Sequence, residues 1–274
     1  MFDLANPIKW DHHLAKGLQF FGLALPGMTG GAKLWNLCDQ HYAPGRHGTL
    51  SGMGIPYASG ASGWQHTANP GHWDELRCNG GSENVGIANT PSLKLVTNFS
   101  VVFNFLYRAQ QNGTIVSMGD AGASSTGSNT SMMRLFQSDI IVTQLGSNIL
   151  QASLTLRRWT HVALVCNTSG SILYYDGQKK ATGAALNTWW NYSGPIRIGR
   201  AEGTYFSASE VAYLGSLDGM MLYNRPLSAQ EVLMLYWESQ QTFPSIVRRI
   251  GGSGIQLGQL AQSAFYANWR RRAA

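Results

Sequence analysis

The sequence predicts an all-β protein: a two-sheet antiparallel jelly-roll sandwich with one short C-terminal helix and an extended C-terminal arm. Three observations support this prediction. Short runs rich in β-branched and aromatic residues recur at spacings of roughly 8–12 residues, which is typical of sandwiches and jelly rolls. One segment has a clear helical signature. Only 12% of the residues are charged and 32 are glycines, as expected for sheets that bury their inner faces.

The strand signal is strongest at residues 99–107, a run dense in β-branched and aromatic side chains. A glycine-containing turn at 110–113 and a second run at 114–118 complete a predicted hairpin. Asp176-Gly177 predicts a two-residue hairpin turn, because glycine accepts a positive φ without steric cost. The other predicted strands, in chain order, are 134–137, 139–143, 149–156, 159–166, 171–175, 196–199 and 215–223.

The helical signature lies at residues 227–236, just after the last predicted strand. Ser228 stands at the N-cap position and Glu231 follows three residues later, which together form a capping box. An apolar stripe that would lie on the sandwich consists of Val232, Leu233, Leu235 and Tyr236. We therefore expect one domain over residues 1–238 and an arm over 239–274.

Positive charge is concentrated in the arm. The chain has 20 basic and 14 acidic residues, a net charge of +6. Without the five arginines of the arm, 15 basic residues remain against 14 acidic ones; these arginines are Arg248, Arg249, Arg270, Arg271 and Arg272. A nucleic-acid-binding domain would be expected to have a basic face on its folded body. We therefore expect the body of the domain to bind no nucleic acid.

The N-terminal residues 1–18 lack the charged start and apolar run of a secretory signal. No apolar stretch approaches the ~20 residues needed to cross a bilayer, so no membrane association is expected. The three cysteines, Cys38, Cys78 and Cys166, have no metal-like spacing, and we expect them to be buried thiols.

The acidic residues and histidines form no recognisable catalytic motif. Retaining glycosidases need two carboxyl groups about 5 Å apart, which one strand supplies through residues i and i+2 or i+4. No such run occurs, and the adjacent Asp74 and Glu75 would point to opposite faces of a strand. A pair assembled from distant strands stays open. No histidine pair has the spacing of a helical zinc site. We predict no enzyme activity, no metal and no cofactor.

Four segments in order resemble laminin-G-like, concanavalin-A-like jelly-roll domains of the lectin-glucanase type found in phage and environmental bacterial proteins. Together they cover residues 34–236. They are Leu34-Trp-Asn-Leu-Cys-Asp39 with His47-Gly-Thr-Leu50, Trp159-Thr-His-Val-Ala-Leu-Val165 with Leu173-Tyr-Tyr-Asp-Gly177, Ile196-Arg-Ile-Gly-Arg200, and Gly215-Ser-Leu-Asp-Gly219 with Tyr223-Asn-Arg-Pro-Leu-Ser-Ala-Gln-Glu231. The resemblance implies the same sandwich that the strand pattern predicts.

The chain departs from this family at an acidic cluster that many members carry. The matching stretch, residues 78–85, keeps only Glu83 as an acidic residue. Calcium takes 6–8 oxygen ligands, usually including several carboxylates. A calcium site is therefore not expected at this position.

Two aromatic-rich loops are candidate glycan-binding sites, since aromatic rings beside amide groups suit stacking on sugars. The first loop contains Trp189, Trp190, Asn191 and Tyr192, and the second region contains Trp64, His66 and Trp73. The alternative is that these rings fill the ends of the sandwich or a subunit interface.

The arm is a candidate partner-binding segment. A flexible stretch at 251–254 precedes an aromatic and arginine-rich end, a composition enriched at protein interfaces. The candidate partner-binding residues are Arg248, Arg249, Phe265, Tyr266, Trp269, Arg270, Arg271 and Arg272. Other virion proteins or further copies of this chain are the expected partners. The alternative is a solvated terminus.

These observations favour a non-catalytic structural and binding protein. The preferred hypothesis is a phage virion component at the virion surface, either a capsid decoration or a tail-associated subunit, which docks through its arm and can bind surface glycans. A free carbohydrate-binding, lectin-like module is the alternative, and a glycoside hydrolase is the least favoured reading.

Overall fold

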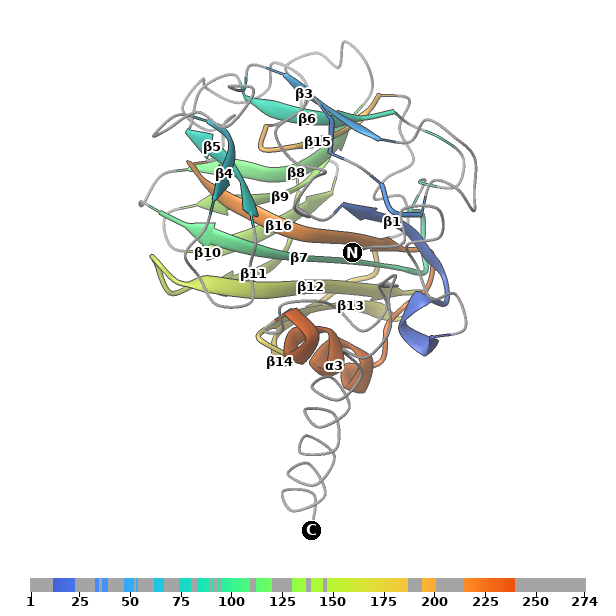
Figure 1. Ribbon diagram of the computed structural model, residues 1–274. Helices are drawn as coiled ribbons and strands as arrows, with labels where there is room; N and C mark the ends of the chain where they lie inside the picture. Colours follow the sequence, from blue (N-terminus) through green and yellow to red (C-terminus); the bar gives the residue numbers. More distant parts are fainter. Residues whose placement is uncertain are drawn as a thin grey trace.

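A computed structural model of the chain describes residues 12–22, 33–34, 36–38, 47–51, 53, 62–66, 74–79, 83–88, 90, 93, 95–108, 112–119, 130–136, 139–144, 147–186, 194–200 and 214–239. These residues form two antiparallel sheets packed face to face, with one α-helix on an outer surface (Figure 1). The predicted all-β sandwich with a short C-terminal helix is confirmed. No helix within these ranges is long and apolar enough to span a membrane.

One sheet, here called the front sheet, has the strand order β14-β13-β12-β7-β16-β5-β4, and β1 also pairs with β16. Its strands are β1 (Leu18–Gly22), β4 (Gly63–His66), β5 (Asp74–Asn79), β7 (Phe99–Tyr107), β12 (Trp159–Asn167), β13 (Gly170–Tyr175), β14 (Gln178–Gly183) and β16 (Leu214–Tyr223).

The second, or back, sheet has the order β11-β10-β9-β8-β15-β6-β3-β2. Its strands are β2 (Lys33–Leu34), β3 (Gly48–Ser51), β6 (Asn84–Ile87), β8 (Gly113–Gly119), β9 (Thr130–Phe136), β10 (Asp139–Gln144), β11 (Ser147–Ser153) and β15 (Ile196–Ile198).

The core lies between the sheets and follows the two-residue period of the strands. Alternate residues of β7 face inward, and each is at most 1% exposed: Phe99, Val101, Phe103, Phe105 and Tyr107. Residues of the back sheet complete the core, among them Val85, Ile87, Met133, Leu135, Ile140 and Val142. Burying a side chain of this size contributes roughly 1.5–3 kcal/mol, so the pattern of β7 alone strongly favours a sandwich.

A second apolar cluster lies on the outer surface of the front sheet, where α3 (Ala229–Ser239) and the short 3-10 helix η1 (His13–Ala15) cover the strands. Two residues of the predicted helical stripe, Val232 and Leu235, are buried there, at 0% and 2% exposure. They pack in one cluster with Val102 of β7 and with Ala163 and Val165 of β12.

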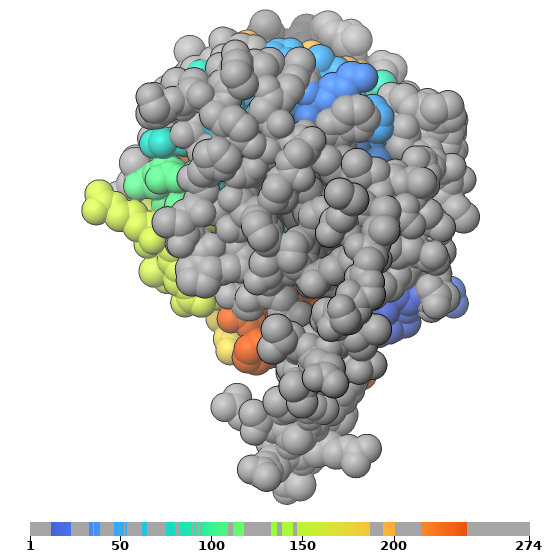
Figure 2. All heavy atoms as spheres, in the orientation of Figure 1, coloured from blue at the N-terminus to red at the C-terminus, as the bar shows by residue number. Residues whose placement is uncertain are grey.

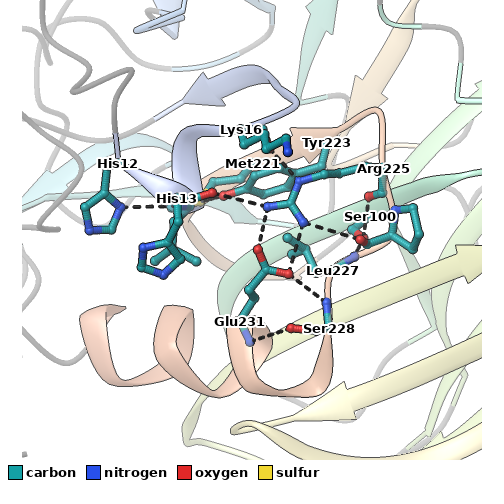
Figure 3. A network of polar contacts seen from close by, with 12 residues as sticks. His12, His13, Lys16, Ser100, Met221, Tyr223, Arg225, Leu227, Ser228 and Glu231 are labelled. Atoms are coloured by element: carbon teal, nitrogen blue, oxygen red, sulfur yellow. Dashed lines mark hydrogen bonds and ion pairs between the residues drawn. The ribbon is translucent and has the colours of Figure 1, made fainter. Parts of the chain in front are cut away.

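Arg225, just after β16, fastens α3 to the sandwich (Figure 3). Its guanidinium donates to both carboxylate oxygens of Glu231, at 2.6 and 3.0 Å, and its Nε donates to the carbonyl of Lys16 at 2.6 Å. Glu231 also accepts from the backbone N–H of Ser228 at 2.9 Å, and the Ser228 hydroxyl accepts from the N–H of Glu231 at 3.2 Å. The predicted capping box is therefore confirmed.

The hairpin turn predicted at Asp176-Gly177 is also confirmed, since both residues have positive φ, 49° and 75°. Several strand predictions need correction. The predicted strand 149–156 ends at residue 153, and a turn begins at 156. The strands β1 to β6 were not predicted. The strand β14 was also not predicted, because its residues are mostly exposed and polar and so lack the apolar alternation of a half-buried strand.

Candidate functional site: a polar row beside an aromatic pair

A row of polar side chains crosses the outer surface of the front sheet, on the side drawn toward the viewer in Figure 1. Asp218 of β16 stands opposite Asn104 of β7, and Asn104 stands opposite His161 of β12. Residues paired in this way share one face of a sheet, and neighbouring strands lie about 4.8 Å apart. Asp218 and His161 are therefore separated by roughly 10 Å along the row.

Glu75 extends this row onto β5. Leu217 and Leu76 are paired between β16 and β5, so Asp218 and Glu75 occupy the next positions on these strands. Oε1 of Glu75 accepts hydrogen bonds from Arg108 Nη2 at 2.5 Å and from the Ser216 hydroxyl at 2.8 Å. The Glu75 side chain is only 5% exposed, whereas that of Arg108 is 32% exposed. A buried carboxylate thus anchors a partly exposed arginine at the end of the row.

The two carboxyl groups of Glu75 and Asp218 bear on the question of catalysis, because they come from strands far apart in sequence. A glycosidase needs one carboxyl group that holds a proton for the leaving group. The Glu75 carboxylate is paired instead with the Arg108 guanidinium. Glu75 thus serves as a fixed acceptor that anchors Arg108 and Ser216.

His161 forms the other end of the row and is 3% exposed. Burial lowers the pKa of its imidazole from 6.5 to about 3, so the ring is neutral at physiological pH. Neither ring nitrogen has a hydrogen-bond partner within the described part of the chain. A neutral imidazole offers one donor and one acceptor. His161 therefore provides two hydrogen-bonding positions that the surrounding described residues do not use.

Two aromatic residues of α3 border the row at His161. The ring of Tyr236 lies 5.9 Å from that of His161, and the ring of Trp237 lies 5.4 Å from that of Tyr236. Trp237 is 42% exposed and is the one exposed large hydrophobic side chain among the described residues. On a helix, residues 233 and 237 share a face, and Leu233 packs against the hairpin tip at Gly177. The packing of this turn of α3 therefore holds Trp237 beside the sheet.

The structure gives different results for the aromatic residues predicted to contact a glycan. Trp64 lies in β4 with its ring in the core, at 0% exposure, and a ring without exposed surface cannot stack on a sugar. His66 ends the same strand, but its side chain lies outside the described part of the structure. The remaining candidates, Trp73, Trp189, Trp190, Asn191 and Tyr192, also lie outside it.

The predicted arm residues likewise lie outside the described residues, namely Arg248, Arg249, Phe265, Tyr266, Trp269, Arg270, Arg271 and Arg272. The sequence analysis did not identify Trp237. The sequence signal for Trp237 was the aromatic pair that it forms with Tyr236 on the last turn of an amphipathic helix. The predicted helix ended at residue 236 and so left Trp237 out.

The stretch that replaces the family's acidic cluster contains Glu83, which is 7% exposed. With its amide nitrogen turned toward Glu83, the Asn79 side chain donates to the Glu83 carboxylate, including a bond of 2.9 Å to Oε2. Burial, and next the Glu83 charge, raise the pKa of the Cys78 thiol to about 12. Within the described ranges, no three residues of the types that bind metals gather in one cluster.

A family model described as the concanavalin A-like lectin/glucanases superfamily matches residues 79–233. No curated protein sequence matches the chain. Among solved structures, a mutant sialidase of Trypanosoma rangeli with trans-sialidase activity is similar, with 14% identity and a TM-score of 0.53. The match covers 83% of this chain but only 34% of the sialidase.

Domain 4 of AbnA, an extracellular GH43 arabinanase of Geobacillus stearothermophilus solved with arabinotriose, shares 14% identity at a TM-score of 0.52. That match covers 80% of this chain and 98% of the domain. The binding domain of Paraclostridial Mosquitocidal Protein 1 shares 15% identity at a TM-score of 0.55, over 82% of this chain and 52% of that one. At such low identities these similarities establish the fold alone.

Proposed function

Because the chain belongs to the concanavalin A-like lectin/glucanase superfamily, we propose that it is a non-catalytic carbohydrate-binding domain that holds a neutral oligosaccharide along the polar row. The observation that carries this proposal is the exposed ring of Trp237 at the border of a row of amide, carboxylate and imidazole groups. A sugar ring has hydroxyl groups at its edge and an apolar face of C–H bonds. The site matches both properties.

In this arrangement, Trp237 stacks on the apolar face of one sugar unit, while Asp218 and Arg108 contact hydroxyl groups of units farther along the row. These three side chains are the accessible part of the site, since Asp218 and Arg108 are partly exposed. Glu75 and Asn104 lie deeper, and Glu75 holds Arg108 in place. The similar domain of the arabinanase, solved with arabinotriose, supports a saccharide ligand.

The aromatic loops of the sequence analysis belong to this proposal as further glycan contacts. Trp189, Trp190, Asn191 and Tyr192 precede β15 in the chain, and His66 and Trp73 flank the connection from β4 to β5. We propose that they extend the sugar-binding surface beyond the polar row.

The test is glycan-array binding followed by titration of the best oligosaccharide into the full chain. Trp237→Ala should weaken binding at least tenfold, because losing a stacked aromatic ring removes one to a few kcal/mol. Trp237→Phe keeps a stacking surface and should retain most of the affinity. Ser147→Ala, at an exposed position on β11 of the back sheet, is the matched control. Unchanged affinity in Trp237→Ala would disprove the proposed site.

Absence of catalysis is part of the same proposal. Incubation of the full chain with β-glucans and with the bound oligosaccharide should yield no hydrolysis products. Turnover that is lost in both Glu75→Gln and Asp218→Asn would overturn the proposal in favour of a glycoside hydrolase.

A second proposed role is that of a phage virion subunit at the particle surface. Its support is the composition of residues 239–274, where five arginines and several aromatic side chains follow the last helix. The arm then binds other virion proteins or another copy of this chain. Deletion of residues 240–274 should abolish particle attachment or self-association but leave glycan binding intact. Retained particle attachment would contradict this role.

A further inference from the structure

Four basic side chains gather at one corner of the sandwich, where the turn between β11 and β12 meets the hairpin of β13 and β14. The turn carries Arg157 and Arg158, and β14 carries Lys179 and Lys180; all four residues are exposed. Figure 2 shows the chain between β11 and β12, in yellow-green, projecting at the edge of the molecule. A chain with only 20 basic residues thus places four of them together. These four residues are here called the basic corner.

An ion pair joins the two segments of the basic corner. Arg158 Nη2 lies 2.5 Å from Asp176 Oδ2 at the hairpin tip, and the other Asp176 oxygen accepts from the N–H of His161 at 3.0 Å. Lys179 follows Gly177 by two residues, which is roughly 7 Å of extended chain. The four cations therefore belong to one surface region.

The backbone of the basic corner is held in a fixed shape. Arg157 has a φ of 59°, a left-handed conformation that costs an arginine on the order of 1 kcal/mol relative to glycine. Its N–H donates to the carbonyl of Tyr107 at 2.8 Å. The hairpin tip is fixed as well, because Gly177 packs against Leu233 of α3. Because the backbone is already fixed, binding of a ligand costs entropy mainly in the side chains.

Two of the four cations already have partners. Arg158 is paired with Asp176, and Lys180 donates to the Gln178 side chain at 3.1 Å. Asp139 of β10 is paired with Ser153 and accepts a hydrogen bond from the Gln151 amide at 2.5 Å. The hydrogen bond from Gln151, and next that from Ser153, lower the pKa of the Asp139 carboxyl. Within the described residues, the side chains of Arg157 and Lys179 form no hydrogen bond or ion pair. Two cations are thus exposed at fixed positions and remain available to an external anion.

We propose that the basic corner binds an anionic polysaccharide, whose carboxylate or sulfate groups pair with Arg157 and Lys179, while Arg158 and Lys180 add positive charge beside them. A guanidinium forms paired hydrogen bonds with such groups, and an ammonium group acts as a point charge beside them. A projecting edge is accessible to a long polymer, and the repeated anions of that polymer can meet several cations at once. This site is separate from the polar row and does not depend on sugar binding there.

Nucleic acid is the other polyanion to consider. Proteins that bind single strands combine cations with exposed aromatic rings on which the bases stack. Among the described residues, Trp237 is the one exposed large aromatic side chain, and it lies one helical turn from Leu233, which packs against the hairpin tip. A single ring offers little surface for successive bases, so the basic corner favours a polysaccharide, which needs charge pairing without base stacking.

The experiment measures binding of the full chain to polygalacturonate, dextran sulfate, uncharged dextran and single-stranded DNA at several salt concentrations. The wild-type chain should bind one or both anionic polysaccharides and not dextran. The double variant Arg157→Gln/Lys179→Gln should bind about tenfold more weakly and show a flatter dependence on salt, since fewer counterions are released. The matched control is Lys16→Gln/Lys33→Gln, which removes two exposed cations elsewhere and should leave binding unchanged.

Three results would overturn this inference: no binding of either anionic polysaccharide at low salt, equal affinities of the wild type and Arg157→Gln/Lys179→Gln, or single-stranded DNA bound as tightly as the polysaccharides. Melting temperatures of both double variants show whether they fold. Binding of a neutral oligosaccharide, which depends on Trp237, reports the polar row separately. Loss of one activity with retention of the other therefore identifies which proposal fails.

Discussion

Arg225 and Glu231 face each other in a paired, two-bond contact at the junction of β16 and α3, with N–O distances of 2.6 and 3.0 Å. Arg225 also lies over the ring of Tyr223, 5.8 Å from its centroid, and bonds the carbonyl of Lys16. One side chain therefore connects the N-terminal segment, the last strand and the helix that carries Trp237.

Replacement of Arg225 by alanine is expected to lower the free energy of unfolding by about 1–2 kcal/mol. The loss arises because Glu231 and the Lys16 carbonyl are both left without this donor. Arg225→Lys should recover only part of the stability, since an ammonium cannot form both bonds to Glu231 in the same geometry. Urea denaturation provides the measurement. Equal unfolding midpoints for Arg225→Ala and the wild type would show that the contact does not stabilise the fold.

Glu231 makes stability sensitive to acid. Burial raises the pKa of its carboxyl, but the hydrogen bonds from Arg225 and Ser228 outweigh this effect and hold the pKa below its ordinary value of 4.5. A group with a lowered folded pKa contributes stability that is complete above the unfolded pKa and is lost as the pH falls through the folded pKa. Glu231→Gln should therefore be less stable than the wild type at pH 7, and the difference should shrink below about pH 4.5. A constant difference across this range would contradict the prediction.

His161 is expected to make the free energy of unfolding depend on pH in a higher range than Glu231 does. Burial lowers the pKa of its imidazole from 6.5 to about 3, so below pH 6.5 the unfolded chain binds a proton that the folded chain does not. Its contribution to stability is complete above pH 6.5 and is lost as the pH falls toward 3. The slope approaches about 1.4 kcal/mol per pH unit. Unfolding free energies of the wild type and His161→Gln, compared at pH 7 and pH 5, test this. If both lose the same stability, His161 is protonated equally in the folded and unfolded chain.

The sandwich could be predicted because its signals are local. Residues 99–107 form one dense run of β-branched and aromatic residues, eight of which are buried, and both residues of the Asp176-Gly177 turn show the positive φ that such turns require. Ser228 and Glu231, three residues apart, likewise establish where α3 begins. Patterns of this kind need no knowledge of distant segments.

The polar row could not be predicted because strand register brings its members together. Asn104, His161 and Asp218 are single polar residues within apolar strands, and no spacing in the sequence links them. Trp64 illustrates the opposite difficulty. Its neighbours suggested an aromatic loop, yet its position in β4 directs the ring into the core. The basic corner was missed for the same reason, since only the pairing of β12, β13 and β14 brings the segments of Arg157 and Lys179 to one region.

Gly177 tests whether hairpin packing holds α3 in place. Its φ is +75°, and a Cβ there would lie 2.6 Å from Leu233 Cδ1, so Gly177→Ala combines backbone strain with a steric clash. We expect a loss of about 1–3 kcal/mol in the free energy of unfolding. Gly86→Ala on β6 is the matched control, because a Cβ there meets only Arg197 Nη1, at 3.6 Å. Thermal unfolding should show a lower melting temperature for Gly177→Ala than for Gly86→Ala. Equal melting temperatures would mean that α3 tolerates displacement at Leu233, and that the position of Trp237 depends on other contacts.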